Sequence, residues 1–146
     1  MQYNENISEA LAVLAQIAPQ SMGTGTTNST AINTKLFRRI IAIVNIGTLG
    51  SSSAVNAQFV ASSTQTGTYT AVSGTLCTNV TTGSTNLVLI ELRAETLAAA
   101  GAGPWVKLQF NISTAASLVS AEVLGTAGYY PSSDYDLVTP TQVLVA

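Results

Sequence analysis

Few residues of this chain have types and spacing that could do chemistry. There is no histidine, which excludes Ser-His and Cys-His nucleophile pairs and removes the commonest transition-metal ligand. Two nearby carboxylates, Glu91 and Glu95, are of the type that a glycosidase uses as an acid pair. Arg93 stands between them and would hold both ionised, so a small ion-pair cluster is the favoured interpretation. We therefore predict that the protein is not an enzyme, and a carboxylate hydrolase is the disfavoured alternative.

Metal and cofactor sites are not indicated either. Asp134 and Asp136 could contribute to a calcium site, but the glycine and the distant glutamate of a calcium loop are missing, so a polar turn is favoured. Gly23 and Gly25 lack the lysine and the strand–loop–helix context of a phosphate loop. The lone Cys77 has no nearby cation to lower its pKa, which indicates a buried spectator. We predict no catalytic, metal-binding or cofactor-binding residue, and no cofactor.

The composition is apolar and poor in charge. Apolar residues make up 47% of the chain and charged residues 8%, against about 25% charged in an ordinary domain. Threonine, serine, asparagine and glutamine must cover much of the surface, and these side chains enter an interface at lower cost than charges. A neutral, threonine-rich β-domain is the plainer alternative. A net charge of −2 with five scattered cations argues against nucleic-acid binding, and no apolar run is long enough to span a membrane.

Residues 35–47 predict the central strand of the fold. Within residues 40–47 the only polar side chain is that of Asn45, and β-branched residues dominate. The turn-forming residues 48–53 follow, and such a run is typical of a strand that is buried on both faces. The apolar residues that we expect in the core are Ile41, Ile43, Phe59, Leu89, Leu108 and Phe110.

The rest of the chain alternates short strands with Gly/Ser/Thr turns. A helical segment of one or two turns, ended by Gly101, is predicted to cross between sheets at 93–100. This spacing predicts an all-β fold, a β-sandwich of about seven or eight strands and either jelly-roll or Ig-like, over residues 31–124. Besides the central strand, the predicted strands are 54–61, 68–72, 75–80, 86–92, 105–113 and 117–124, with a short one near 30–34.

Two terminal segments are predicted to leave the sandwich. Apolar residues recur at helical spacing before Pro19, which predicts a short amphipathic helix over 6–18. A flexible arm over 20–30 completes an N-terminal unit of residues 1–30. The C-terminal extension, residues 125–146, is rich in tyrosine and ends apolar. The candidate partner-binding residues in the two segments are Ile7, Leu11, Leu14, Tyr129, Tyr130, Tyr135, Val143 and Leu144.

Five pieces of the sequence occur in a characteristic order between about residues 30 and 136: 35–47, 55–61, 67–69, 90–97 and 128–134. In that order they resemble a family of small structural proteins encoded in the head gene clusters of tailed bacteriophages. The resemblance implies a capsid decoration or cement protein that binds outside the major capsid shell. It implies two partners, the major capsid protein and further copies of the chain as a dimer or trimer. The implied location is the virion surface, after synthesis in the host cytoplasm.

The aromatic residues leave a different function open. Trp105, Tyr129, Tyr130 and Tyr135 could form a sugar-binding or partner-binding surface, or they could pack the C-terminal segment onto the domain. A receptor- or carbohydrate-binding module of a phage head or tail fibre is therefore the alternative function. A cluster of exposed aromatic side chains would favour it.

Overall fold

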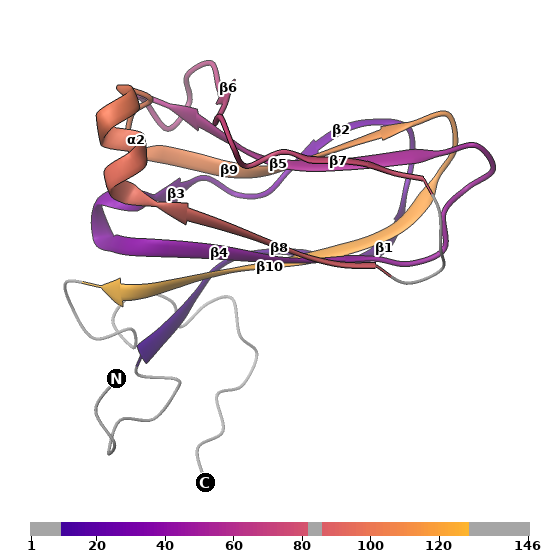
Figure 1. Cartoon of the computed structure of the whole chain (residues 1–146), viewed down its shortest axis with the longest axis horizontal. Helices are drawn as coiled ribbons and strands as arrows, with labels where there is room; N and C mark the ends of the chain where they lie inside the picture. Colours follow the sequence, from indigo (N-terminus) through magenta and orange to yellow (C-terminus); the bar gives the residue numbers. More distant parts are fainter. Residues whose placement is uncertain (1–9, 82–85, 129–146) are drawn as a thin grey trace, which may run out of the picture.

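The computed structural model describes residues 10–81 and 86–128, which form two facing antiparallel sheets (Figure 1). Sheet A has the order β1-β10-β4-β8, that is Leu11–Met22, Ser117–Gly128, Phe37–Ile46 and Asn86–Arg93. Sheet B has the order β2-β9-β5-β6, that is Gly25–Asn28, Trp105–Ser113, Ala54–Ser62 and Thr70–Ala71. In sheet B, β3 (Ile32–Asn33) also pairs with β9, and β7 (Cys77–Val80) also pairs with β5. The predicted all-β sandwich is confirmed.

The strand pairs are nested along the sequence. β1 pairs with β10, β2 with β9, β4 with β8, and β5 with β7. Most connections cross between the sheets, including η1 (Thr34–Leu36) before β4 and the helix α2 (Ala94–Ala100) between β8 and β9. This is the topology of a jelly roll, which decides between the two sandwich types that the sequence left open. The helix α2 covers one end of the sandwich (Figure 1).

The core lies between the sheets and takes alternate residues from each long strand. Along β9 every second residue is buried, because successive side chains of a strand point to opposite faces. Leu108 and Phe110 on β9 and Phe59 on β5 are fully buried, as predicted. Each such side chain contributes about 1.5–3 kcal/mol when it leaves water. At the α2 end, Leu97 is also buried in this core, and Gly101 at a φ of 65° ends the helix as predicted.

β4 is interior to sheet A, between β10 and β8, but only one of its faces is buried. Ile41 and Ile43 are half-buried on the outer face, and Leu89, which lies opposite Ile43 on β8, is 60% exposed. The core prediction is therefore wrong for these three residues. In β4 the even-numbered and the odd-numbered residues, which point to opposite faces of the sheet, are both largely apolar. The sequence alone therefore does not say which of these two phases faces the core. The buried phase is Ile40, Ala42, Val44 and Ile46.

From Leu11 onward, β1 replaces the predicted N-terminal helix. Ala12, Ala15 and Ile17 face the core, at spacings of three and two residues. The spacing of three arises at a register shift before Ala15, because an extra residue in a strand displaces the inward phase. Such bulges make a strand imitate the apolar spacing of a helix. Pro19 lies in a second register shift on this edge strand, where its missing N–H is tolerated.

Residues 20–30, predicted as a flexible arm, instead finish β1 and form β2 on the edge of sheet B. Asn28 Oδ1 accepts a hydrogen bond from Gln109 Nε2 at 3.0 Å. The N–H of Leu108 donates to Ser29 Oγ at 2.9 Å. The polar composition of this segment predicted flexibility, but its polar side chains form hydrogen bonds that hold it against β9. The arm prediction is wrong because hydroxyl and amide groups can form hydrogen bonds to a neighbouring strand as well as to water.

β10 runs past the end predicted at residue 124. A Cβ on Gly125 would lie 2.7 Å from side-chain carbons of Leu14 and Phe37, so only glycine leaves room for both. Pairing between β10 and β4 then continues until Gly128 lies opposite Phe37. Residues 125–128 of the predicted extension therefore belong to the sandwich.

Candidate interaction surface

The outer face of sheet A is largely apolar. Leu87 and Leu89 on β8 are 63% and 60% exposed. Ile41 and Ile43 on β4 and Leu124 on β10 are half-buried on the same face. We call these five residues the apolar stripe. Exposed leucines scattered singly are ordinary on a protein surface, whereas a contiguous group on one sheet face indicates an interaction site.

The register of the strands makes the apolar stripe continuous. Leu124 lies opposite Ile41, and Ile43 lies opposite Leu89. Directly opposed side chains on one sheet face have Cβ atoms about 4.5–5.5 Å apart, close enough for contact. Along a strand, residues two apart on one face are the next neighbours. The apolar stripe therefore crosses the sheet diagonally, from Leu124 on β10 over β4 to Leu87 near the start of β8.

Charged side chains lie on both sides of the apolar stripe. On one side, Arg39 of β4 lies opposite Arg93 of β8, and Arg39 Nη1 is 3.9 Å from Glu91 Oε1. On the other side, Glu122 of β10 lies opposite Ile43. The Arg39–Glu91 side chains are 58% and 51% exposed, so this ion pair contributes about 0–1 kcal/mol to stability. We call Arg39, Arg93 and Glu91 the basic corner, because two cations there exceed one anion.

The outer face of sheet B has a different character. Gln58 Nε2 on β5 donates to Gln109 Oε1 on β9 at 3.0 Å, and Gln109 Nε2 donates to Asn28 Oδ1 on β2 at 3.0 Å. One row further, Asn56 lies opposite Asn111. We call the Gln58–Gln109–Asn28 chain the amide ladder. The amide donors and acceptors of the ladder form hydrogen bonds with one another, so this face does not need a protein neighbour to supply hydrogen-bond partners.

The same face of sheet B carries an aromatic site. Lys107 Nζ lies 4.2 Å from the centroid of the Tyr69 ring, a cation–π distance. The Tyr69 hydroxyl donates to the carbonyl oxygen of Gln65 at 2.7 Å, and burial raises the pKa of this phenol. Trp105, two residues before Lys107 on β9, is half-buried. The rest of the predicted aromatic cluster lies outside the described residues: Tyr129, Tyr130 and Tyr135.

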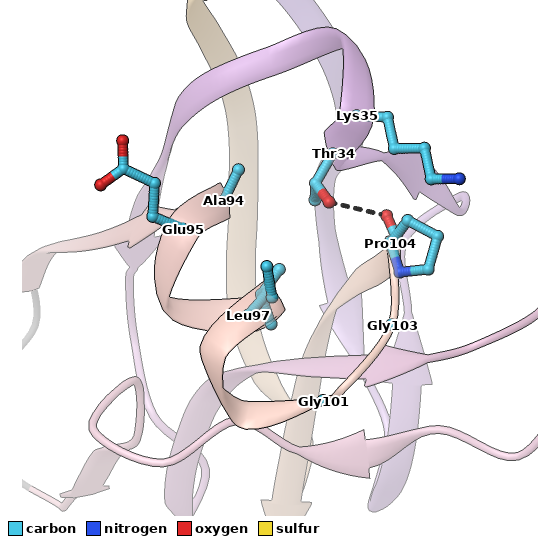
Figure 2. Close-up of a pocket in the computed structure, with 9 residues that line it drawn as sticks. Thr34, Lys35, Ala94, Glu95, Leu97, Gly101, Gly103 and Pro104 are labelled. Carbon is cyan, nitrogen blue, oxygen red and sulfur yellow. Dashed lines mark hydrogen bonds between the residues drawn. The ribbon is translucent and has the colours of Figure 1, made fainter.

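A pocket of about 560 Å³ lies at the α2 end, between η1, α2 and the loop after α2. Alanine, glycine and proline form most of its wall. Thr34 Oγ1 donates to the carbonyl oxygen of Pro104 at 2.9 Å (Figure 2). Lys35 and Glu95 lie on opposite sides, with their charged ends pointing away from each other (Figure 2). The pocket is thus an apolar recess in which the hydroxyl of Thr34 is already bonded.

Two of the eight predicted partner-binding residues fall within the described residues. Leu11 begins β1 opposite Thr126, and Leu14 packs against the core beside Phe37. A shared helical stripe does not join them, because both lie in a strand. The other six lie outside the described residues: Ile7, Tyr129, Tyr130, Tyr135, Val143 and Leu144.

The sequence reasoning missed the apolar stripe, although β8 contained a signal for it. Leu87, Leu89, Glu91 and Arg93 share one phase of the strand. A phase that holds two charged residues faces away from a core, and its leucines then lie on the surface with them. The register across β4 extends this exposed phase to Ile43, which faces Leu89.

Groups with catalytic potential do not converge in the part of the chain that the structure describes. No three acidic or cysteine residues there are placed to hold a metal ion. Glu91 pairs with Arg39 of β4, whereas the predicted cluster centred it on Arg93. Cys77 is half-buried, and desolvation raises the pKa of its thiol, which leaves it protonated and unreactive near neutral pH. Among the described helices, none is long and apolar enough to cross a membrane.

Comparison with solved structures finds the same fold in a viral protein. A chain in the structure of infectious bursal disease virus Gt strain aligns with 84% of this chain at a TM-score of 0.51 and 16% identity. A chain from the Gx strain aligns with 84% at a TM-score of 0.47 and 17% identity. This chain spans 33% of the length of each viral chain. At such identity the likeness is one of fold. No family model and no curated protein matches the sequence.

Proposed function

We propose that this chain is a non-enzymatic virion structural protein that decorates the outside of a tailed-bacteriophage capsid and bridges neighbouring capsid subunits. The observation that carries the proposal is the jelly-roll sandwich itself, and its apolar outer face supports a place in an assembly. Jelly rolls are a frequent architecture of capsid domains, and an apolar sheet face is suited to a protein neighbour. The fold shared with an infectious bursal disease virus chain and the ordered resemblance to phage head proteins support a place in a virion.

The apolar stripe contributes little to the folding of an isolated chain. Its leucines on β8 remain 63% and 60% exposed, so most of their apolar area is still in water. Covering apolar area with protein contributes about 25 cal/mol per Å². A chain with only 8% charged residues has few ionic contacts to offer instead. An assembly in which neighbours cover this face gains the stabilisation that the monomer leaves unused.

The capsid contact is assigned to the terminal segments, residues 1–9 and 129–146. β1 and β10 are neighbours in sheet A, with Leu11 opposite Thr126, so both segments continue from one end of the sandwich. Fully extended, they would reach about 30 Å and about 60 Å. Two segments from one end can contact two subunits that a compact sandwich does not reach. Each contact is weak, but a repeating shell multiplies it through multivalency.

Deletion variants test the capsid contact. The full chain, a variant that lacks residues 1–9 and a variant that lacks residues 129–146 are added to undecorated heads. The N-terminal deletion stops at residue 9, because removal of β1 would expose the core of sheet A. The full chain should bind and raise the temperature at which the heads release DNA, and each deletion should weaken binding at least tenfold while circular dichroism stays unchanged.

A matched control and two contrary outcomes complete the test. Leu76→Lys changes a leucine that is 51% exposed and lies outside sheet A, so this variant should bind as the full chain does. Full binding by both deletion variants would rule out the terminal segments as the capsid contact. Failure of the full chain to bind any undecorated head would rule out decoration itself.

The alternative, a receptor- or carbohydrate-binding module, would use the aromatic site of sheet B. Trp105 is the available aromatic residue there, but it is half-buried, and Lys107 already lies over the Tyr69 ring. Stacking on a sugar needs an open ring face, so this surface supports the alternative less well. Binding of the purified chain to a glycan array, lost on Trp105→Ala, would favour the alternative over decoration.

A further inference from the structure

We propose that the outer face of sheet A binds a second copy of this chain, face to face, about a two-fold axis that runs along the apolar stripe. The surface consists of the apolar stripe, the basic corner and Glu122. This inference goes beyond the capsid role, because it concerns the purified chain in solution and stands or falls without a capsid. The physical reason is that the face is complementary to itself.

The apolar part of the face is complementary to itself on such an axis. A two-fold axis places the same patch of both copies in contact. With the axis along the apolar stripe, the exposed Leu87 and Leu89 of each copy lie over the stripe of the other. The half-buried Ile41 and Ile43 complete the layer. Apolar side chains that are in water in one copy are then covered by identical side chains from its partner.

The charged part of the face is complementary to itself on the same axis. Rotation about the apolar stripe exchanges its two sides, so Glu122 of one copy comes to lie over the Arg39–Glu91 pair of the other copy's basic corner. Symmetry repeats this contact, which gives two equivalent contacts. Arg39 and Arg93 with Glu91 leave one net positive charge in the corner, and Glu122 supplies one negative charge. Opposite charges at the rim of an interface set its register and exclude other arrangements.

The geometry of the sheet is compatible with this dimer. Because the apolar stripe crosses the strands diagonally, the two sheets pack with their strands crossing at a large angle, near the orthogonal arrangement of stacked sheets. Four strands about 4.8 Å apart, each about eight residues long, present a face of about 500 Å². Two such faces bury about 1,000 Å², the lower limit for a specific interface. We therefore expect a dimer that dissociates on dilution.

Sheet B does not offer the same opportunity. Three of its outward side chains are held in the amide ladder, where Gln109 already bonds to both Gln58 and Asn28. A second copy placed there would have to break these bonds or bury them without new partners, and either costs free energy. The second copy is therefore assigned to sheet A.

The first test measures the mass of the purified full chain over a range of concentrations by sedimentation equilibrium. The chain of 15.0 kDa should approach twice that mass as concentration rises. Leu89→Lys puts a charge into the apolar stripe and should weaken the dimer at least tenfold. Leu76→Lys is the matched control, since Leu76 is 51% exposed outside sheet A, and it should dimerise as the unchanged chain does. A full chain that stays monomeric, or a Leu89→Lys variant that dimerises normally, overturns the proposal.

The second test exchanges charges and addresses the two-fold axis itself. Glu122→Arg alone, and Arg39→Glu with Arg93→Glu in a second variant, each bring like charges together in a homodimer. Each variant should dimerise at least tenfold more weakly than the unchanged chain. An equal mixture of the two should form heterodimers at close to the original strength, because both contacts are then between opposite charges. If the mixture does not associate, the axis is wrong.

Two other occupants of the face give distinct results. If residues 129–146 of the same chain cover the apolar stripe, the full chain is monomeric and the variant without these residues dimerises. If a capsid subunit covers it, the full chain is monomeric and Leu89→Lys loses binding to undecorated heads. Either result overturns the second-copy proposal. Head binding by a monomeric chain leaves the decoration proposal intact, so the two proposals fail separately.

Discussion

The outer face of sheet A carries leucine and isoleucine where the outer face of sheet B carries glutamine and asparagine, although both sheets share one core. On β4 the outward positions include Ile41 and Ile43, whereas on β9 they include Gln109 and Asn111. On sheet B the glutamines bond to one another across strands. On sheet A, Leu87 and Leu89 of β8 are not covered by any described residue to a comparable extent and remain 63% and 60% exposed.

This difference separates what folding needs from what assembly needs. A sandwich folds when one face of each sheet is apolar, and both sheets meet that condition with a common cluster of buried residues. The second apolar face of sheet A is additional to that condition. An exposed apolar face also raises the risk of unspecific association. Its presence is therefore best explained by a specific protein neighbour.

The largest expected effect compares adjacent residues of β4. Ile40 is fully buried and Ile41 is half-buried on the outer face. Ile40→Ala should lower the free energy of unfolding by about 2–5 kcal/mol, because it leaves a cavity in the core. Ile41→Ala should cost less than half as much. Urea unfolding at dilutions where the chain is monomeric measures both, and equal losses would contradict an outer face that is open in the monomer.

An intermediate effect is expected in the amide ladder. Gln109→Ala removes both ladder hydrogen bonds and should lower the free energy of unfolding by about 1 kcal/mol. Gln16→Ala, at an exposed glutamine on β1 of sheet A, is the matched control and should change it by less than about 0.5 kcal/mol. Thermal or urea unfolding distinguishes the two. If Gln16→Ala lowers the free energy of unfolding as much as Gln109→Ala does, the amide ladder contributes nothing to stability.

The smallest effect concerns Cys77 on β7, which pairs with β5 in sheet B. Desolvation raises the pKa of its thiol in the folded protein, so the folded chain holds the proton more tightly than the unfolded chain. This contribution to stability is complete below the unfolded pKa and is lost as pH rises through the folded pKa. Iodoacetamide at about pH 8 should modify Cys77 several-fold more slowly in the folded chain than in urea. Equal modification rates in the folded chain and in urea would show that the thiol of Cys77 is fully accessible to solvent in sheet B.

Strand β9 shows how much of the fold the sequence predicts. Its clean alternation places Leu108 and Phe110 in the core and Gln109 outside, and the structure agrees. The helical turns after β8 and their end at Gly101 were also predictable, because alanine favours a helix and glycine a left-handed φ. These features depend on residues that are close together in the chain, so the sequence alone is enough to predict them.

Strand β1 and the apolar stripe show where sequence reasoning fails. The bulges in β1 shift its inward phase, and bulges depend on the partner strand β10, which is about a hundred residues away in the chain. In β4 both phases are apolar, so Ile41 and Ile43 could not be assigned to a face without knowing what lies on each side. The candidate surface was missed for the same reason, since its five residues come from three strands.

By itself the sequence determined an all-β chain with little charge, no histidine and strands whose side chains alternate between two environments. These properties follow from composition and from local periodicity, which do not depend on distant partners. Only the tertiary structure decided the nested pairing of a jelly roll and the side of β4 that faces the core. It alone also showed that leucines of β8 continue the isoleucines of β4 into one exposed face. Such features arise from contacts between segments far apart in the chain, and hydrogen bonding between strands fixes them only once the sheets have formed.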